Sequence, residues 1–366
     1  MNLLLTIDHF GSGGAQRQIV TLAKGLVRQG HHVDFFIYYP EFKHFRAEVE
    51  KAGIPIYEAP KKKKGFSSKV MLALRKKLKT GKYQAVISFL DTPNIYAELA
   101  GIGLKNVKII VSERNSYLKE TSKITSLAKR ITHSLADVII ANSTSQAEWL
   151  KKTYPWLKHK TLTIYNGYDL NEFTIQAIPE LQHKNLKLLG IGRITYQKNQ
   201  YNFIKALDLF YQENGWCPEI NWVGDLQASA EGLYKKKIDT LLDTLPHVKT
   251  NWKWLGERND IPQLLAEHHA LISPSYFEGF PNVVCEALLS GRPVLTTDVC
   301  DNGYLVKDGA RGFLFHPHNP DQISQALKKL ATLDKTSLTT LSANSREFAM
   351  NNLGQERYVG MYASLL

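Results

Sequence analysis

Two glutamates, Glu278 and Glu286, stand on either side of a Gly/Pro turn with seven residues between them. The turn follows a short apolar segment, Ala270 to Ile272, and precedes an apolar run that begins at Pro281. This order predicts a strand, a turn and a helix, with a ligand site at the carboxyl end of the strand. Glu278 would lie before the helix and Glu286 about one and a half turns inside it, so both would flank the free N–H groups of the helix N-terminus. Those N–H groups favour an anion or a hydroxyl-rich ligand.

Two cations, Arg193 and Lys198, follow another apolar segment, Lys187 to Ile191. At the carboxyl end of a strand, two fixed cations can stabilise a departing diphosphate without a metal ion. An arginine and a lysine on a loop are also common on solvated surfaces. The two residues alone therefore do not establish a diphosphate site, and further motifs in the chain are needed to support it.

A glycine-rich loop, Gly11 to Gly14, connects an apolar segment, Leu3 to Ile7, to an amphipathic helical pattern. Glycine lets backbone N–H groups approach a phosphate closely, so this loop is a candidate anion site. It lacks the third glycine of the dinucleotide fingerprint, and no acidic residue ends the following strand, Val33 to Tyr38. A plain tight turn is an equally good interpretation of this loop by itself.

The run from Ser273 to Leu288 resembles the retaining glycosyltransferases of family 4, which carry a Glu-x7-Glu motif in the second of two Rossmann-like domains. The resemblance implies a GT-B fold of the α/β class, in which the two domains face each other across a cleft and a C-terminal helix crosses back to the N-terminal domain. It also implies that Glu278 contacts hydroxyls of the donor sugar, that Glu286 holds the ribose, and that Arg193 and Lys198 bind the diphosphate. The donor-binding residues implied are Gly14, Arg193, Lys198, Arg258, Glu278, Gly279, Phe280, Pro281, Asn282 and Glu286. Those implied to take part in catalysis are Arg193, Lys198 and Glu278.

The acceptor side is implied less directly by the resemblance. Arg17 follows the glycine-rich loop, and Glu113, Arg114 and Asn115 follow a predicted strand, Lys108 to Ser112. Polar residues directly after a strand of an α/β sheet point into the ligand crevice. Many relatives place a histidine near this cleft, and this chain has Ser-Glu-Arg-Asn instead, as in a subgroup of bacterial polysaccharide-building enzymes. His133 is interpreted as a helix residue and not as a base.

The length of 366 residues favours two domains, because a single core seldom grows this large. The stretch from Asn166 to Asp169 resembles the signature at which family members cross into the second domain. We therefore expect an N-terminal acceptor-binding domain at 1–170, a nucleotide-sugar-binding domain at 171–345, and a terminal helix at 346–366 that packs on the N-terminal domain.

Composition narrows the class of protein. Hydrophobic residues make up 43% and charged residues 22% of the chain, which is ordinary for a globular protein. The three cysteines are too few for a disulfide framework and lack metal-ligand spacing, which indicates a reducing compartment. No run of 18 apolar residues and no signal peptide is found, so we expect a cytoplasmic protein.

The net charge of +12 is concentrated in the N-terminal half. Residues 1–170 hold 27 Lys and Arg against 13 Asp and Glu, whereas residues 171–366 hold 19 against 21. A lysine run, 61–64, precedes an amphipathic segment, Ser67 to Lys79, that carries further cations. This pattern suits an anionic membrane surface on the inner face of the cytoplasmic membrane, and a solvated helix packed on a sheet is the equal alternative. Nucleic acid is not expected as a partner, because cations and aromatic residues are not interleaved on one face.

Taken together with these patterns, the resemblance implies transfer of a hexose or N-acetylhexosamine from a nucleotide sugar with retention of configuration. UDP is the preferred nucleotide, by resemblance. The acceptor would be a saccharide, carried on a lipid, in surface polysaccharide synthesis. No Asp-x-Asp motif lies in a suitable loop, so we expect metal independence and no cofactor besides the donor. The alternatives are a catalytically silent sugar-nucleotide-binding scaffold and a nucleotide-sugar epimerase on the same frame.

Overall fold

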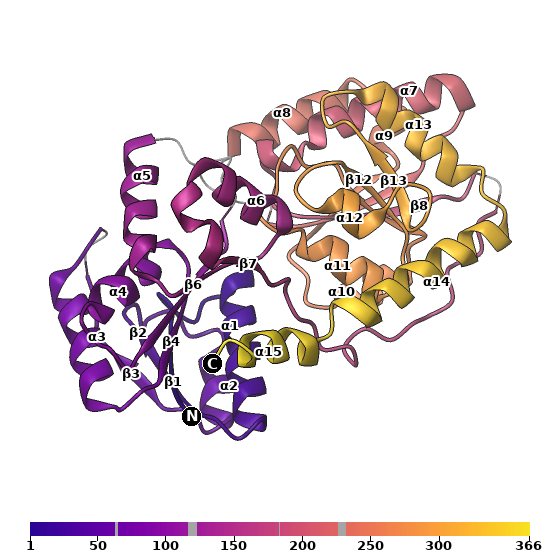
Figure 1. Ribbon diagram of the computed structural model, residues 1–366. Helices are drawn as coiled ribbons and strands as arrows, with labels where there is room; N and C mark the ends of the chain where they lie inside the picture. The colour runs from indigo at the N-terminus through magenta and orange to yellow at the C-terminus, as the bar shows by residue number, and fades with distance from the viewer. Residues whose placement is uncertain (63–64, 116–122, 183, 226–231) are drawn as a thin grey trace. The chain divides into compact units, whose positions relative to one another are not determined.

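The computed structural model describes residues 1–62, 65–115, 123–182, 184–225 and 232–366 (Figure 1). The chain divides into two compact units. Unit 1 comprises residues 1–168 and 353–366, and unit 2 comprises residues 169–352. Lys63 and Lys64 of the predicted lysine run lie outside the described residues.

The described part of unit 1 contains a parallel sheet with the strand order β3-β2-β1-β4-β5-β6-β7. Its strands are β1 (Asn2–Thr6), β2 (His32–Ile37), β3 (Ile56–Glu58), β4 (Ala85–Phe89), β5 (Lys108–Glu113), β6 (Val138–Ala141) and β7 (Thr161–Thr163). The central strands are apolar on both faces because helices cover both sides of the sheet. The reversal of strand order beside β1 creates the crevice at which open α/β sheets bind ligands.

Helices pack on the two faces of this sheet through separate cores. One core joins Leu3 and Leu5 of β1 to Ile19 of α1, and the other joins Leu4 of β1 to Leu74 of α3. The helical segments of unit 1 are α1 (Gly14–Arg28), α2 (Arg46–Lys51), α3 (Ser68–Thr80), α4 (Asp91–Gly101), α5 (Lys123–Thr132), η2 (His133–Leu135), α6 (Thr144–Thr153), η3 (Pro155–Lys160) and α15 (Gln355–Ala363).

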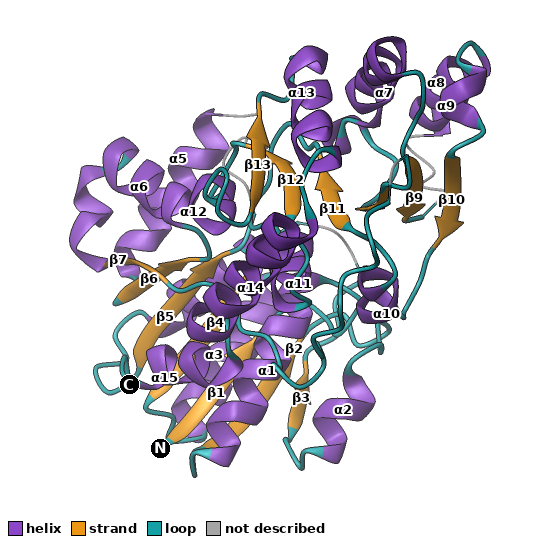
Figure 2. Cartoon of the chain, turned by 90° about the vertical axis from the view of Figure 1, so that its right-hand side faces the viewer, coloured by secondary structure: helices purple, strands orange, loops and turns teal. Residues whose placement is uncertain are grey.

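In unit 2 the described residues form a second parallel sheet, with the order β10-β9-β8-β11-β12-β13. Its strands are β8 (Lys187–Ile191), β9 (Glu219–Val223), β10 (Trp252–Gly256), β11 (Ala270–Ser273), β12 (Val294–Thr297) and β13 (Gly312–Phe315). Its helical segments are η4 (Tyr196–Lys198), α7 (Gln200–Asn214), α8 (Gly232–Asp243), α9 (Pro246–Lys249), α10 (Ile261–Ala266), α11 (Asn282–Leu289), α12 (Asn302–Val306), α13 (Pro320–Ala331) and α14 (Lys335–Asn352). Helices α7 and α13 lie side by side on this sheet (Figure 2). The predicted α/β class with two Rossmann-like sheets is confirmed.

The C-terminal segment 346–366 is not one helix. Its first part belongs to α14 in unit 2, where Phe348 packs edge-on against Tyr304 with ring centroids 5.5 Å apart. The chain leaves the helical conformation at Leu353 and Gly354, and α15 then packs beside α1 in unit 1 (Figure 1). Val359 of α15 lies so close to Gly25 that a Cβ there would meet it at 2.3 Å. The predicted return to the N-terminal unit is therefore made by α15.

Among the described residues, no helix has both the length and the apolar character needed to cross a membrane. Helix α3, predicted as basic and amphipathic, forms with Ser67 as its N-cap. Its buried side chains are Val70, Leu74 and Leu78, so its apolar face packs on the sheet. Leu72 remains 57% exposed on the solvent side, among lysines.

Candidate functional site

Two loops of unit 2, one after β8 and one after β11, are joined by an ion pair. The Nζ atom of Lys198 lies 2.7 Å from Oε1 of Glu278, and the two side chains are 17% and 10% exposed. The side chain of Gln197 donates to the carbonyl of Phe277 at 2.8 Å and to Oε2 of Glu278 at 3.4 Å. In return, the carbonyl of Gln197 accepts a hydrogen bond from the backbone N–H of Tyr276 at 2.9 Å. The sequence-predicted diphosphate and sugar residues, Lys198 and Glu278, are therefore brought together.

Glycines let the loops at this edge of the sheet approach one another. The N–H of Gly192 donates to the carbonyl of Val223 at 2.8 Å, and that of Gly224 donates to Gly256 at 2.9 Å. Gly224 has a φ of 158°, and a Cβ there would lie 2.1 Å from the carbonyl oxygen of Gly192. Only glycine fits this contact, which fixes the loops that follow β8, β9 and β10.

The two predicted arginines of unit 2 differ in their surroundings. Arg193 is exposed and has no ion-pair partner within the described ranges. Nε and Nη2 of Arg258 donate to the two carboxylate oxygens of Asp260, at 2.8 Å and 2.5 Å. This hydrogen bond raises the pKa of Arg258 and lowers that of Asp260. Arg258 is thus held by a carboxylate of its own loop, whereas Arg193 presents its guanidinium to solvent.

Helix α11 begins at Asn282, and Pro281 occupies the N-cap position, one residue later than the sequence predicts. Phe280 and Pro281 are buried, so they shape the loop from within, whereas Gly279 and Asn282 are partly exposed. The carbonyl of Gly279 accepts a hydrogen bond from Sγ of Cys300 at 3.0 Å, which anchors the loop to the segment after β12.

Glu286 lies inside α11, and its side chain is partly exposed. Its backbone carbonyl accepts from the N–H and the hydroxyl of Ser290, both at 3.0 Å. Because α11 begins at Asn282, Glu286 is the fifth residue of the helix and lies about one turn inside it, slightly less far than the sequence predicts.

In unit 1, the glycine-rich loop leads directly into α1. Gly14 is the first residue of the helix, and Gly13 precedes it as an N-cap without a side-chain hydrogen bond. Arg17 is exposed, and its guanidinium carbon lies 5.2 Å from the centre of the Phe45 ring. The N-terminal N–H groups of α1 therefore follow the glycine-rich loop, and the side chain of Gln16 lies over that loop, where it would be 2.0 Å from a Cβ on Gly13.

Glu113 is completely buried, unlike a residue that faces an acceptor. Its carboxylate lies 2.8 Å from Nε2 of His133, 3.0 Å from Nζ of Lys129 and 3.2 Å from a guanidinium nitrogen of Arg130. Burial would raise the pKa of Glu113, but Lys129 and Arg130 outweigh burial and hold it well below its usual value. Glu113, predicted to lie on the acceptor side, thus has a buried carboxylate whose partners among the described residues are Lys129, Arg130 and His133.

His133 lies in the short helical segment η2 and is fully buried between two glutamates. Its Nδ1 lies 2.5 Å from Oε1 of Glu98, and its Nε2 faces Glu113. Burial alone would lower the pKa of His133, but the hydrogen bonds with Glu113 and Glu98 raise it to about 9. His133 is therefore a structural cation, in keeping with its interpretation as a helix residue and not a base.

Arg114 is also buried, and it ties β5 to the terminal helix α15. Its guanidinium donates to the hydroxyl of Tyr362 at 2.9 Å and to Oδ1 of Asn166 at 2.5 Å. It also lies 4.0 Å from the ring centre of Phe89. Glu113 is the last residue of β5, one residue beyond the predicted end of the strand, and of Glu113, Arg114 and Asn115 only Asn115 is exposed.

Asp91 is a residue of this edge that the sequence analysis missed. It begins α4 directly after β4, and its side chain is 41% exposed. Its carboxylate lies 2.5 Å from Nζ of Lys129 and accepts from Asn115 at 3.4 Å. An acidic residue that follows an apolar strand and opens a helix was the available signal.

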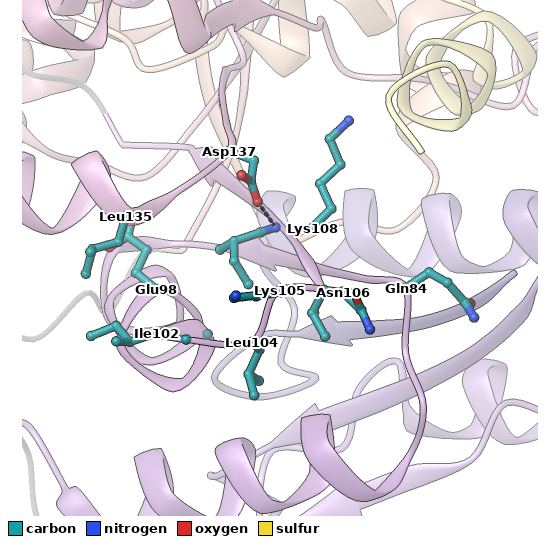
Figure 3. A pocket seen from close by; sticks show the side chains of 13 residues that line it. Gln84, Glu98, Ile102, Leu104, Lys105, Asn106, Lys108, Leu135 and Asp137 are labelled. Carbon is teal, nitrogen blue, oxygen red and sulfur yellow. Dashed lines mark hydrogen bonds between the residues drawn. The ribbon is translucent and has the colours of Figure 1, made fainter.

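A separate hollow of unit 1, about 690 Å³ in volume, lies at the opposite edge of the sheet, by the amino ends of β4, β5 and β6 (Figure 3). Beside it, the carboxylate of Asp137 accepts from the N–H of Ile109 at 2.7 Å. None of the sequence-predicted site residues lines this hollow. Within the residues that the structure describes, no group of three His, Cys, Asp or Glu side chains is arranged to hold a metal ion.

Family models match both halves of the chain. Residues 12–172 match the model described as Glycosyltransferase Family 4, and residues 171–348 match the model described as Glycosyl transferases group 1. The two matched ranges together span nearly all of the chain.

Two curated relatives are bacterial glycosyltransferases. The chain is 28% identical, over 97% of its length and 93% of the relative's, to a Campylobacter jejuni alpha-1,4-N-acetyl-D-galactosaminyltransferase that acts on a diphosphoundecaprenol-linked saccharide. It is 27% identical, over 77% of its length and 75% of the relative's, to the Escherichia coli UDP-Gal:alpha-D-GlcNAc-diphosphoundecaprenol alpha-1,3-galactosyltransferase.

Solved structures share the fold along the whole chain. A glycosyltransferase from Rickettsia africae aligns with a TM-score of 0.84 at 18% identity, over 100% of this chain and 97% of that one. Anabaena Alr3699/HepE in complex with UDP and glucose aligns with a TM-score of 0.81 at 20% identity, over 100% and 99% of the two chains. These likenesses establish a GT-B architecture.

Proposed function

Because the chain belongs to the GT-B glycosyltransferases, with a family 4 domain followed by a group 1 domain, we propose that it transfers a hexose or N-acetylhexosamine from a UDP-sugar to a lipid-linked saccharide. The two bacterial relatives described above act on diphosphoundecaprenol-linked saccharides, and one of them uses a UDP-sugar. The acceptor and the donor nucleotide are carried to this chain from those relatives.

The observation that carries the proposal is the pairing of Lys198 with Glu278 across two loops at the carboxyl edge of unit 2. A nucleotide sugar has a diphosphate directly bonded to a hydroxyl-rich ring. A cation 2.7 Å from a carboxylate matches this order of groups, because the ammonium suits the diphosphate and the carboxylate accepts from sugar hydroxyls. Exposed Arg193, from the same loop as Lys198, would supply the second cation.

In the mechanism that we propose, these two cations stabilise the negative charge that develops on the departing diphosphate. Glu286 binds the ribose hydroxyls from inside α11, and the loop from Gly279 to Asn282 borders the sugar. The acceptor hydroxyl attacks from the face that the diphosphate leaves, so the anomeric configuration is retained. The leaving phosphate oxygen takes the proton of that hydroxyl, and neither a metal ion nor a further cofactor takes part.

The basic surface of unit 1 is suited to an anionic membrane, in which a lipid-linked acceptor would be anchored. Helix α3 carries lysines around an exposed Leu72, a combination that favours the surface of an anionic membrane. We propose peripheral association of unit 1 with the inner face of the cytoplasmic membrane. Vesicles with and without anionic lipid would test this, since a solvated helix would give no sedimentation with either.

The donor site is tested by calorimetric titration of UDP, GDP and ADP without metal, on the wild-type protein and on Glu286→Ala. We expect one nucleotide, UDP, to bind the wild type, and the variant to bind it at least tenfold more weakly. Absence of binding by all three nucleotides would contradict the proposal. Product analysis with a lipid-linked disaccharide then separates a transferase from a silent scaffold, which would bind UDP-sugar without consuming it, and from an epimerase, which would consume it without an acceptor.

A further inference from the structure

Four aromatic rings form a continuous row on the surface of unit 2. The ring of Tyr196 stacks on that of Tyr276, with centroids 4.7 Å apart and 25° between the planes. The ring centroid of Tyr276 lies 4.5 Å from that of His318, and the ring centroids of His318 and His316 lie 5.6 Å apart. Tyr196 is 60% exposed, both histidines are exposed, and Tyr276 is partly exposed. We call these four residues the ring row.

Internal hydrogen bonds fix the ring row from below. The amide of Asn202 on α7 donates to the hydroxyl of Tyr276 at 2.9 Å and to the carbonyl of Pro317 at 3.1 Å. The amide of buried Asn199 donates to the carbonyls of Pro274 and Pro317, at 2.9 Å and 2.8 Å. Three segments that are distant in sequence are thereby held in one arrangement, as a preformed binding surface requires.

The ring row is continuous with the candidate donor site. Tyr276 stands two residues before Glu278 in the same loop, and Tyr196 precedes Gln197, whose side chain binds Phe277 and Glu278. The three contributing segments follow β8, β11 and β13, so the rings lie at the carboxyl edge of the sheet. A ligand on the row would therefore border the Lys198–Glu278 pair.

We propose that the ring row is a saccharide subsite in which the face of Tyr196 turned away from Tyr276 holds the C–H face of a pyranose residue of the acceptor, because stacking covers the faces between neighbouring rings. A pyranose ring has faces made of C–H groups, and these carry slight positive charge that is attracted to the negative face of an aromatic ring. Exposed aromatic groups that gather on one surface are a common mark of a ligand site. This inference rests on the proposed function, because that function supplies a saccharide acceptor, and it adds the place where one of its sugar residues lies.

The test is saturation-transfer NMR with two probes, the methyl α-glycosides of N-acetylgalactosamine and of galactose. Wild type, Tyr196→Ala and Tyr211→Ala are compared, each with and without saturating UDP. Tyr211 is the matched control, since it stacks on His247 at 4.0 Å and is also exposed, but lies near the other end of α7. We expect the ring C–H protons of a probe to receive saturation from the wild type and the control, and Tyr196→Ala to bind roughly three- to tenfold more weakly.

Three results would overturn the subsite: no binding of either glycoside to the wild type, equal binding by Tyr196→Ala, or displacement of the glycoside by UDP. Displacement by UDP would assign the rings to the nucleobase, which also stacks on aromatic faces. The UDP titration separates this failure from failure of the proposed function. A wild type that binds UDP but no glycoside contradicts the subsite alone, whereas one that neither binds UDP nor transfers a sugar contradicts the proposed function.

Discussion

The ammonium of Lys198 lies 2.7 Å from the carboxylate of Glu278, and this contact joins the loop after β8 to the loop after β11. Both side chains are mostly buried, so the pair is screened less by solvent than an ion pair on the surface. Gln197 reinforces the same connection through Phe277. The orientation of the cation and that of the carboxylate are thus set together, and a change in either one alters the surroundings of the other.

Replacement of Lys198 by alanine should lower kcat about 10²- to 10³-fold, because one of the groups that stabilises the departing diphosphate is removed. Steady-state kinetics with a UDP-sugar measures the effect. Lys249→Ala is the matched control, since Lys249 also pairs with a carboxylate, Asp243, at 2.7 Å but is exposed. Equal rates for wild type and Lys198→Ala would remove this residue from the mechanism.

Replacement of Glu286 by glutamine should weaken UDP binding about tenfold and leave the melting temperature nearly unchanged. A carboxylate accepts charge-assisted hydrogen bonds from the ribose hydroxyls. A neutral amide of the same shape does not provide such bonds. Calorimetry with UDP and with uracil distinguishes a lost contact with the ribose from a lost contact with the base. Uracil lacks the ribose, so its affinity should not change. A variant that binds UDP as the wild type does would show that the ribose is held elsewhere.

Substitution of Gly224 by alanine should destabilise the protein by about 1–3 kcal/mol, because its φ of 158° and its contact with the carbonyl of Gly192 leave no room for a side chain. Gly232→Ala is the control, since a Cβ at that position meets no atom of the described residues within 4 Å. Urea unfolding gives both free energies. We also expect weaker UDP binding by Gly224→Ala, because the loops after β8 and β9 are held together by this contact.

Much of the fold follows from local patterns in the sequence. Apolar segments such as Ala270 to Ile272 became buried parallel strands, and the glycine and proline residues after them became loops at the carboxyl edge. The juxtaposition of Lys198 and Glu278, which are far apart in sequence, agrees with the prediction that both line one site, although their functional roles stay predictions.

Contacts between residues that are distant in sequence explain why the surroundings of Glu113, Arg114 and Asn115 were not predicted. Residues that follow a strand usually face the crevice, but Arg114 finds the hydroxyl of Tyr362 in α15 and turns inward. Glu113 turns inward to His133, and the exposed carboxylate beside Asn115 comes from Asp91 at the start of α4. Such pairings depend on which strands and helices become neighbours, and spacing along the chain does not encode that choice.

His133 should give the free energy of unfolding a distinct dependence on pH. Its pKa is raised in the folded protein to about 9 from 6.5, so its contribution is fully present below pH 6.5 and is lost as the pH rises through about 9. This contribution is roughly 3 kcal/mol at most. Glu113 has a lowered pKa, so its own contribution is present above its unfolded value and is lost in acid.

Urea unfolding between pH 6 and pH 10 measures this dependence, and His133→Gln should lose the alkaline decline that the wild type shows. His247→Gln is the control, because His247 pairs with Asp208 at 2.8 Å while remaining about one quarter exposed. NMR of the wild type gives a second measurement that needs no variant, since a histidine held between Glu98 and Glu113 should keep its charged ring signals from pH 6 to pH 8. A His133 ring that titrates near pH 6.5 would show that the two carboxylates do not stabilise its charge in the folded protein, and the alkaline decline should then be absent as well.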